Sequence, residues 1–269
     1  MGVYSLESAA EASRLEEQAY RDNYSIENEF RNFSFDPDER VMDAGCGTGV
    51  LSRYLVEHFG VKHVEALDYS DLRLKQARDL LKGKSKKAIH FMQQDLSQLD
   101  PRFYGKYDTV ICRYVIEHMA EPLLALQGLQ KALKKNGRLI VVELDGVFTN
   151  LYSENVLFNH YLEEFKRKIH FDLNIGKKVP NYLKRVGLSH IEWDVTLIKC
   201  QGKTLQEERE NTVQRFRSLR DFFTEIFGQA EKSDEFMQLY LEEMGRPENT
   251  LVFNKYICTG KNCGPVSSA

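Results

Sequence analysis

The chain has 269 residues, of which 42% are hydrophobic, and this is enough for one large core or for one core with a small lid. A formal net charge of −3 and a pI near 6.2 argue against a strongly basic face, so we expect no nucleic-acid partner. The five cysteines form no C-x-x-C pair and no cluster with histidine at zinc spacing, which predicts free thiols in a reducing cytoplasm and no metal site. No apolar run approaches the ~20 residues that span a bilayer, and the charged N-terminal segment is not typical of a signal peptide. We therefore expect a cytoplasmic protein without membrane contact.

Residues 1–38 precede the first predicted strand and are interpreted as an N-terminal helical arm. The segment is rich in charged residues, and apolar side chains recur along it, as at Leu6, Leu15 and Tyr20. No motif fixes the direction in which the arm points. Its side chains therefore have two interpretations, as helix surface and packing or as contacts with a bound ligand.

Residues 41–49 carry the most informative pattern in the chain. A short apolar run ends at Asp43, and Gly45, Gly47 and Gly49 fall within the next six positions, before a helical pattern at 50–59. Glycine permits positive φ and lets a ligand approach the bare backbone, while a helix N-terminus offers free N–H groups. The segment predicts a strand, a tight turn and a helix that bind a nucleotide-like ligand with an anionic end. Its third glycine comes one residue too early for the G-x-G-x-x-G fingerprint, which argues against a NAD-dependent dehydrogenase.

Residues 39–145 alternate between predicted strands and helices, a pattern that builds a parallel sheet. After them we expect an aromatic-rich helix over 150–173, a helix from Ile175, a strand at 190–198, two helices within 204–244 and a last strand at 250–258. The aromatic residues of these helices are either core or part of an apolar substrate site. The tail, 262–269, is expected to be disordered.

The glycine turn and four later segments together resemble the class I S-adenosylmethionine (SAM) methyltransferases, most closely those of bacterial small-molecule metabolism. The later segments begin at Asp68, Gln94, Tyr107 and Asn136, and the resemblance extends over almost the whole chain. It implies an α/β fold with a doubly wound, Rossmann-like, mostly parallel seven-stranded sheet, an antiparallel last strand and a helical cover. The expected parts are the arm at 1–38, a SAM-binding core at 39–149, and the rest of the core at 150–261 with a helical cap at about 204–245.

The same resemblance implies which residues bind SAM. Asp68 would accept hydrogen bonds from the ribose hydroxyls, Tyr69 would lie against the adenine, and Asp95 would accept from the adenine amino group. The backbone at Arg113 would face the amino group of the methionine part. The full set of expected cofactor residues comprises Arg14, Tyr20, Asp43, Gly45, Cys46, Gly47, Gly49, Asp68, Tyr69, Gln94, Asp95, Leu96 and Arg113. For Asp68 and Asp95 the alternative is that each only caps the turn or helix that follows.

Three residues are candidates for contact with the methyl acceptor. His118 could act as a base near neutral pH, although relatives also carry histidine here in a structural role. Glu143 and Asp145 follow the predicted fifth strand, where α/β sheets place their ligands, and are otherwise solvated loop carboxylates. Methyl transfer from SAM needs a base only if the nucleophile must lose a proton as it reacts.

The expected function is transfer of a methyl group from SAM to an O, N or C nucleophile of a small molecule. The alternatives are a methyltransferase that acts on tRNA or protein, and a SAM-binding protein without catalysis. Relatives often have Pro-Asp-Trp after the post-strand glutamate, whereas this chain has Leu-Asp-Gly-Val-Phe. The acceptor therefore cannot be transferred from the resemblance, and the oligomeric state stays open.

Overall fold

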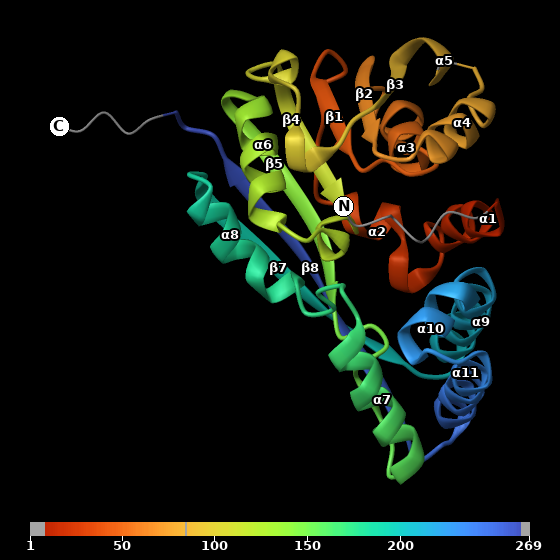
Figure 1. Cartoon of the computed structure of the whole chain (residues 1–269). Coiled ribbons are helices and arrows are strands. Elements are labelled where there is room, and N and C mark those ends of the chain that lie inside the picture. Colours follow the sequence, from red (N-terminus) through yellow and green to blue (C-terminus); the bar gives the residue numbers. More distant parts are fainter. Residues whose placement is uncertain (1–8, 84, 265–269) are drawn as a thin grey trace.

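The computed structural model describes residues 9–83 and 85–264, which fold around one eight-stranded sheet (Figure 1). The strand order is β3-β2-β1-β4-β5-β8-β6, and β7 pairs with β8 beside this path. Strands β1 to β5 run parallel, whereas β8 is antiparallel to β5, β6 and β7. This confirms the expected doubly wound, mostly parallel sheet with an antiparallel last strand. The strands are β1 (Arg40–Ala44), β2 (His63–Asp68), β3 (Ile89–Gln93), β4 (Tyr107–Arg113), β5 (Leu133–Asp145), β6 (Leu151–Tyr152), β7 (Ser189–Cys200) and β8 (Thr250–Lys261).

The sheet has one strand more than the seven that we predicted. The additional strand, β6, contains only two residues and lies in the stretch 150–173, which we expected to be one helix. Helix α7 begins at Val156, with Asn155 as its N-cap, and ends at Lys168. Two residues are too few to show the period-2 pattern of a strand, so β6 has no signal in the sequence.

Helices cover both faces of the sheet (Figure 1). The alternation along β5 shows both cores, because Leu139 and Val141 pack with α6 and α8, whereas Ile140 and Val142 pack with α2 and α3. A strand buried on both faces reads as a continuous apolar run, as predicted for this segment. The α-helices are α1 (Ala9–Gln18), α2 (Ile26–Phe30), α3 (Val50–His58), α4 (Asp71–Asp79), α5 (Ser85–Ala88), α6 (Pro122–Ala132), α7 (Val156–Lys168), α8 (Val179–Arg185), α9 (Lys203–Ser218), α10 (Arg220–Phe227) and α11 (Ala230–Gly245). The short 3-10 helices are η1 (Asp22–Tyr24), η2 (Leu96–Gln98), η3 (Pro101–Phe103), η4 (Ile116–His118) and η5 (Gly176–Lys178).

The insertion between β7 and β8 contains three helices, α9 to α11, where we expected two. Helix α9 ends at the C-cap Leu219. Helix α10 ends at Gly228, which adopts the left-handed conformation with a φ of +73°. Their aromatic side chains form a core with α7, in which Phe165 stacks on Phe223 and on Phe236. These three rings therefore pack as core of the cap, which is the first of the two interpretations that we gave for the aromatic residues.

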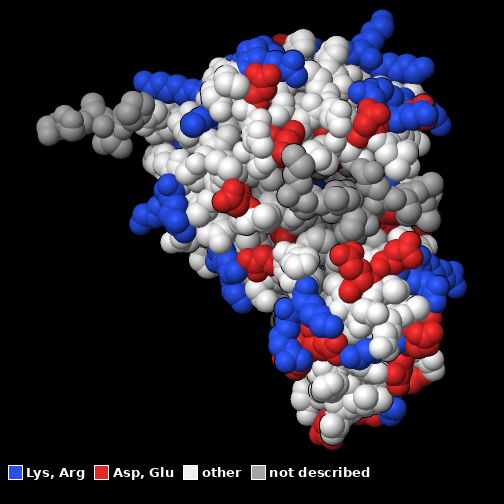
Figure 2. Space-filling view, viewed as in Figure 1, with Lys and Arg blue, Asp and Glu red and all other residues white. Residues whose placement is uncertain are grey.

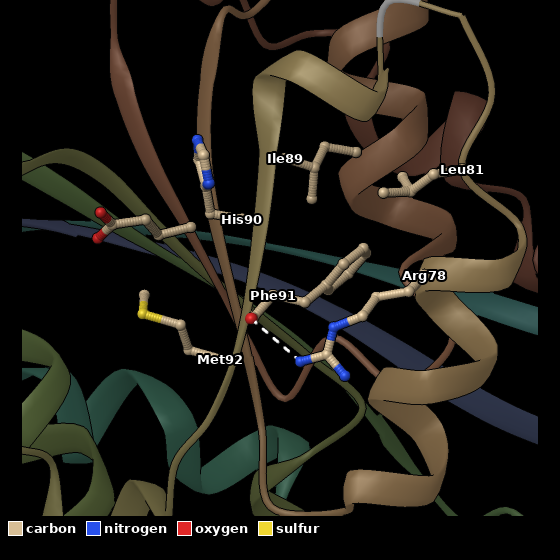
Figure 3. A pocket seen from close by; sticks show the side chains of 7 residues that line it. Arg78, Leu81, Ile89, His90, Phe91 and Met92 are labelled. Atoms are coloured by element: carbon tan, nitrogen blue, oxygen red, sulfur yellow. Dashed lines mark hydrogen bonds between the residues drawn. The ribbon is translucent and has the colours of Figure 1, made fainter.

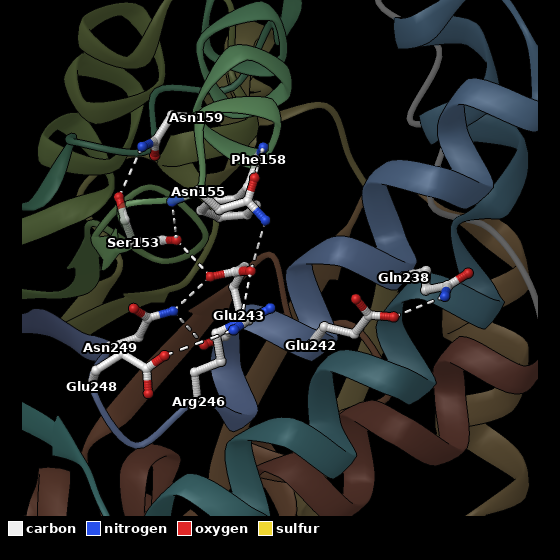
Figure 4. Close-up of polar contacts among 10 residues, drawn as sticks. All are labelled: Ser153, Asn155, Phe158, Asn159, Gln238, Glu242, Glu243, Arg246, Glu248 and Asn249. Carbon is white, nitrogen blue, oxygen red and sulfur yellow. Dashed lines mark hydrogen bonds and ion pairs between the residues drawn. The ribbon is translucent and has the colours of Figure 1, made fainter.

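A buried carboxylate fastens the far end of the cap to α7 (Figure 4). Glu243, near the end of α11, is 1% exposed and accepts hydrogen bonds from Ser153, Asn155 and Asn249. Burial alone would raise the pKa of Glu243, but these hydrogen bonds and Arg246 hold it below its usual range. The cap is thus anchored at the N-terminus of α7 as well as through the aromatic core.

The C-terminal segment is ordered further than we expected. Strand β8 continues to Lys261, and the side chain of Asn262 donates to the carbonyl oxygens of Leu133 and Lys134. The prediction of a disordered tail from residue 262 was wrong for Asn262, and residues 265–269 lie outside the described residues. Among the helices of the described chain, none combines the length and apolarity that crossing a membrane requires. The described residues also contain no cluster of His, Cys, Asp and Glu that could hold a metal ion.

Candidate active site

The glycine turn lies between the carboxyl end of β1 and the start of α3, as predicted. Gly45, Gly47 and Gly49 all have positive φ (+77°, +54° and +75°). A Cβ at Gly45 would lie 2.4 Å from Val115, and one at Gly49 would lie 2.7 Å from Phe91, so packing excludes larger residues at both positions. A Cβ at Gly47 would meet no atom within 4 Å. The turn is thus closed by packing at its two ends and open in the middle, where a ligand can reach the backbone.

Asp68 at the end of β2 faces this open glycine. Its Oδ2 accepts a hydrogen bond from the Gly47 N–H at 2.7 Å, and its Oδ1 accepts from the Ser70 N–H at 2.9 Å. The fold therefore brings together two of the expected cofactor residues that lie 21 positions apart in the sequence. Tyr69, the next residue, is exposed, so its ring is accessible to a ligand.

The segment after β3 lies beside Asp68. The Gln94 N–H donates to the carbonyl oxygen of Asp68 at 2.9 Å. Asp95 accepts from the N–H and hydroxyl of Ser97 through one oxygen, so it caps η2, and Leu96 is buried. The cap interpretation of Asp95 is thus observed, and its role toward adenine stays a prediction.

Asp43 is a buried carboxyl group behind the glycine turn. It is 2% exposed and accepts a hydrogen bond from the Ser52 hydroxyl at 2.5 Å. Burial raises its pKa to about 6. Burial likewise raises the pKa of the Cys46 thiol well above its usual range, so the thiol stays neutral, and its contact with the cofactor stays a prediction.

The side chain of Arg113 binds the N-terminal arm. Its Nε donates to Glu29 of α2 at 2.6 Å, and Glu29 also pairs with Lys255 at 2.7 Å and with the Tyr114 hydroxyl at 2.6 Å. Burial would raise the pKa of Glu29, but Arg113 and Lys255 hold it below its usual range. Glu29 therefore fastens the arm to the carboxyl end of β4 and to Lys255 of β8. No local pattern singles out Glu29, because its partners lie 84 positions or more away.

The arm contacts the glycine turn through a residue that we had not singled out. Glu16 of α1 accepts hydrogen bonds from the hydroxyl of Thr48 and from the guanidinium of Arg53. Arg14, which we expected near the cofactor, instead binds Glu11, Gln18 and Asn211 of the cap. Tyr20 is exposed. Helix α1 therefore bridges the glycine turn and α9, and Glu16 is its contact with the turn.

Replacing Glu16 by glutamine should weaken SAM binding by about fivefold to tenfold, because a charge-assisted hydrogen bond that holds the turn is lost. Calorimetric titration of SAM measures the change. Glu17→Gln, at an exposed position next to it, is the matched control and should bind as the unchanged protein does. Equal affinities of the two variants would show that the contact does not support the cofactor site.

Glu143 and Asp145 both point from β5 toward backbone N–H groups. Glu143 is fully buried, and its Oε1 accepts from the N–H groups of Val115 and Ile116 at 2.9 and 2.8 Å. Asp145 is 4% exposed and accepts from the Lys177 N–H at 3.3 Å, at the start of η5. Burial raises the pKa of both carboxyl groups, for Glu143 well above its usual range. Neither is the solvated loop carboxylate of our alternative interpretation.

His118 lies at the end of η4, directly after the loop whose backbone N–H groups bind Glu143. Its ring packs edge-on against Phe171 with centroids 4.7 Å apart, and its Nε2 is 3.4 Å from a carboxylate oxygen of Glu117. The side chain is 21% exposed. Of the three acceptor candidates it is therefore the one with solvent access.

A separate hollow of about 510 Å³ lies outside this constellation, at the edge strand β3 (Figure 3). Arg78 of α4 crosses toward β3 and donates to the carbonyl oxygen of Phe91 at 3.3 Å. None of the residues that line the hollow belongs to the expected cofactor set. Its lining residues are Glu65, Arg78, Leu81, Ile89, His90, Phe91 and Met92.

Comparison with known proteins finds methyltransferases. A family profile described as "Methyltransferase domain" matches residues 35–217. The ubiquinone biosynthesis O-methyltransferase of Erwinia tasmaniensis is 31% identical over 107 residues, which cover 40% of this chain and 43% of that protein. The match thus spans less than half the length of this curated relative.

Solved structures are similar over most of the chain. The phosphoethanolamine N-methyltransferase 2 of Haemonchus contortus, in complex with phosphomonomethylethanolamine and S-adenosylhomocysteine, has a TM-score of 0.59 and 17% identity, over 94% of this chain and 57% of that one. A putative methyltransferase of Bacillus halodurans has a TM-score of 0.56 and 19% identity, over 89% of this chain and 99% of that one. At these identities the likeness concerns the fold.

Proposed function

The chain belongs to the methyltransferase-domain family, and on this premise we propose that it transfers the methyl group of SAM to an O, N or C nucleophile of a small molecule. One observation carries the proposal. The open backbone at Gly47 and the carboxylate of Asp68 lie within hydrogen-bond distance at the carboxyl edge of a parallel sheet. This is where doubly wound sheets bind nucleotide-like ligands.

The residues present fit SAM. In the proposal, Asp68 accepts from the ribose hydroxyls, Tyr69 and Leu96 flank the adenine, and the turn from Gly45 to Gly49 receives the methionine part. Asp95 has a carboxylate oxygen left after capping η2, which suits a bond from the adenine amino group. When bound, SAM supplies an activated methyl group on a sulfonium, so the protein's work is to orient the nucleophile and to exclude water.

We propose that Glu143 and Asp145 act by holding loops. Glu143 fixes the loop after β4 through two backbone N–H groups, and Asp145 fixes the start of η5. Both loops border the edge where the acceptor would meet the methyl group. His118 stays the candidate for proton transfer, because it is the partly exposed member of the three.

The variant Glu143→Gln distinguishes positioning of the loop from proton transfer. Glu143→Gln keeps an oxygen that accepts from Val115 and Ile116, so turnover should stay within a few-fold of the unchanged protein if the role is positioning. A loss of kcat by about 10²–10⁴ in this variant would instead indicate proton transfer. His118→Ala should lower kcat on that scale if His118 is the base, with SAM affinity unchanged. If His118→Ala, Asp145→Ala and Glu143→Ala all keep full turnover, none of the three takes part in the chemistry.

The small acceptor is supported by the arm and the cap, which both lie at the carboxyl edge of the sheet (Figure 1). Basic and acidic side chains are interspersed on the coloured part of the face shown in Figure 2, a distribution that does not favour nucleic acid. The name of the curated relative also refers to the biosynthesis of a small molecule, although the match covers 40% of this chain. A cytoplasmic location belongs to the same proposal, because the described chain has five free cysteines.

Turnover with methyl-labelled SAM tests the proposal against its alternatives. A cell extract is separated into small molecules, RNA and protein, and each fraction is supplied with the purified chain. Label in a small product, with formation of S-adenosylhomocysteine (SAH), is the expected result. Label in RNA or protein would favour a macromolecular acceptor, and tight SAM binding without SAH formation from any fraction would favour a non-catalytic protein.

A further inference from the structure

Helix α9 presents a polar face to the interior of the protein. Glu208, Asn211, Thr212 and Arg215 lie on one side of this helix and are all 8% exposed or less. Charged residues are seldom buried to this degree unless they are paired or serve a site. The face lies where the cap meets the arm, because the Glu208 carboxylate accepts from the Tyr24 hydroxyl at 3.0 Å.

Three polar atoms of this face have no well-aligned hydrogen bond among the described residues, although the side chains of Glu208 and Asn211 lie close enough to interact. They are Oε2 of Glu208, Nδ2 of Asn211 and Nη1 of Arg215. The Glu208 and Arg215 side chains are an ion pair at 3.9 Å, which is too long for a direct hydrogen bond. A buried donor or acceptor without a partner is costly, and three on one helix face point to a missing ligand.

A small cavity of about 10 Å³ lies against this face. That is the room for one oxygen-sized group, and Glu208, Thr212 and Arg215 supply its polar wall. Opposite them is Phe148, whose φ of +66° is rare for an aromatic residue and whose ring lies 5.0 Å from the Arg215 guanidinium. Such strain is typical of functional sites. The remaining walls come from the apolar residues Val147, Leu251 and Phe253 and from Tyr240.

The cavity lies near the carboxyl end of β4, beside which the acceptor should meet the methyl group, with aromatic side chains between them. Val147 and Phe148 follow Asp145 directly after β5. Tyr24, which binds Glu208, also accepts from Arg113 through its carbonyl oxygen at 2.7 Å. Its ring lies edge-on to that of Tyr114, with centroids 6.2 Å apart. One aromatic layer therefore separates the polar face of α9 from the carboxyl end of β4.

We propose that this cavity, between the polar face of α9 and Phe148, binds a neutral hydroxyl head group of the methyl acceptor, as in an alcohol or a phenol, which both donates and accepts hydrogen bonds. The formal charges of Glu208 and Arg215 cancel, and the next pair on the arm side, Glu11 with Arg14, cancels as well. A charged head group would thus be buried without a counter-ion, which is unfavourable. These three atoms comprise two donors and one acceptor, which suits a hydroxyl group because it both accepts and donates. The inference rests on the proposed function, because it names the acceptor class of the same site.

Three probes of equal ring size test the charge of the head group. Benzyl alcohol is neutral, benzoate is an anion, and benzylammonium is a cation. Their binding to the full chain, saturated with SAH, is measured by saturation-transfer NMR titration. We expect benzyl alcohol to bind at least about tenfold more tightly than either ion. SAH binding itself is measured first by calorimetry, so that failure of the cofactor site is recognised separately from failure of this inference.

Single substitutions on α9 should then change which of the three probes binds most tightly. Glu208→Gln leaves Arg215 without its counter-ion and should favour benzoate by about tenfold or more over benzyl alcohol. Arg215→Met leaves Glu208 and should favour benzylammonium in the same way. Arg220→Met removes an exposed arginine of α10 that pairs with Asp234, and should leave all three affinities unchanged.

Two results would overturn the inference. One is that the protein binds SAH but does not bind benzyl alcohol more tightly than the two ions, or binds none of the three probes. The other is a preference that both α9 variants, folded and binding SAH normally, leave unchanged. If the ion pair of Glu208 and Arg215 were only structural, either substitution would lower the stability of the protein without changing which probe binds most tightly. Should one variant fail to fold, the other still decides the outcome.

Discussion

Replacing Asp68 by alanine should weaken SAM binding by at least about a hundredfold. In the proposed site, this carboxylate accepts two hydrogen bonds from the ribose, and each bond to a charged acceptor contributes about 1.5–3 kcal/mol. Each 1.4 kcal/mol corresponds to about tenfold in affinity. The same substitution removes the partner of the Gly47 N–H, so the turn itself should become less ordered. Calorimetric titration of SAM and SAH measures the loss.

Two variants separate the ribose contact from general effects. Asp38→Ala removes an exposed carboxylate that pairs with Lys62, and SAM affinity should not change. Asp68→Asn keeps the shape and one acceptor oxygen, so it should fall between the unchanged protein and Asp68→Ala. If Asp68→Ala folds and binds SAM with unchanged affinity, the cofactor site has been assigned to the wrong residues.

Replacing Asp43 by asparagine should raise the stability of the protein above pH 6 relative to the unchanged chain. The folded-state pKa of Asp43 is raised from 3.8 to about 6 by burial. Because the folded state holds the Asp43 proton more tightly than the unfolded state does, protonation stabilises the folded state, and this stabilisation is complete below pH ~4. It is lost as the pH rises through about 6. A difference of this size between the pKa values of the folded and unfolded states corresponds to about 3 kcal/mol. Asparagine does not titrate and can still accept from the Ser52 hydroxyl.

Urea unfolding of both proteins between pH 4 and pH 7 measures this difference. The free energy of unfolding of Asp43→Asn, minus that of the unchanged protein, should rise by about 2.5 kcal/mol between pH 4 and pH 7, because the rest of the difference develops below pH 4. Asp79→Asn removes an exposed carboxylate of α4 and controls for the loss of one charge. A difference that stays flat or falls with pH would show that Asp43 is ionised throughout in the folded state.

The local parts of the candidate site were predictable from the sequence. The glycine turn is set by residues within ten positions of one another, and positive φ at Gly45, Gly47 and Gly49 follows from their type. Ser70 as the N-cap of α4 follows from the same kind of local rule. The continuous apolar run of β5 indicated a buried parallel strand for the reason that the structure shows, with helices on both faces.

Contacts across long separations were not predictable. Glu16, Glu29 and Glu208 read as ordinary charged positions of amphipathic helices, and only the tertiary fold gives them buried partners. Arg14 was singled out from the resemblance, but the angle of α1 turns it toward Asn211 of the cap. Residues 143 and 145 were expected at the sheet edge, whereas their bonds to the loops after β4 and before α8 depend on how those loops return to the sheet.

A crystal structure of the chain with SAH tests the central claim most directly. The proposal predicts that the ribose hydroxyls lie within hydrogen-bond distance of the Asp68 carboxylate and that the methionine part crosses the turn at Gly47. The Gly47 N–H, now bonded to Asp68, lies where the ligand must approach. Density for SAH in the hollow beside β3, or anywhere else than between Asp68 and the glycine turn, would contradict the account.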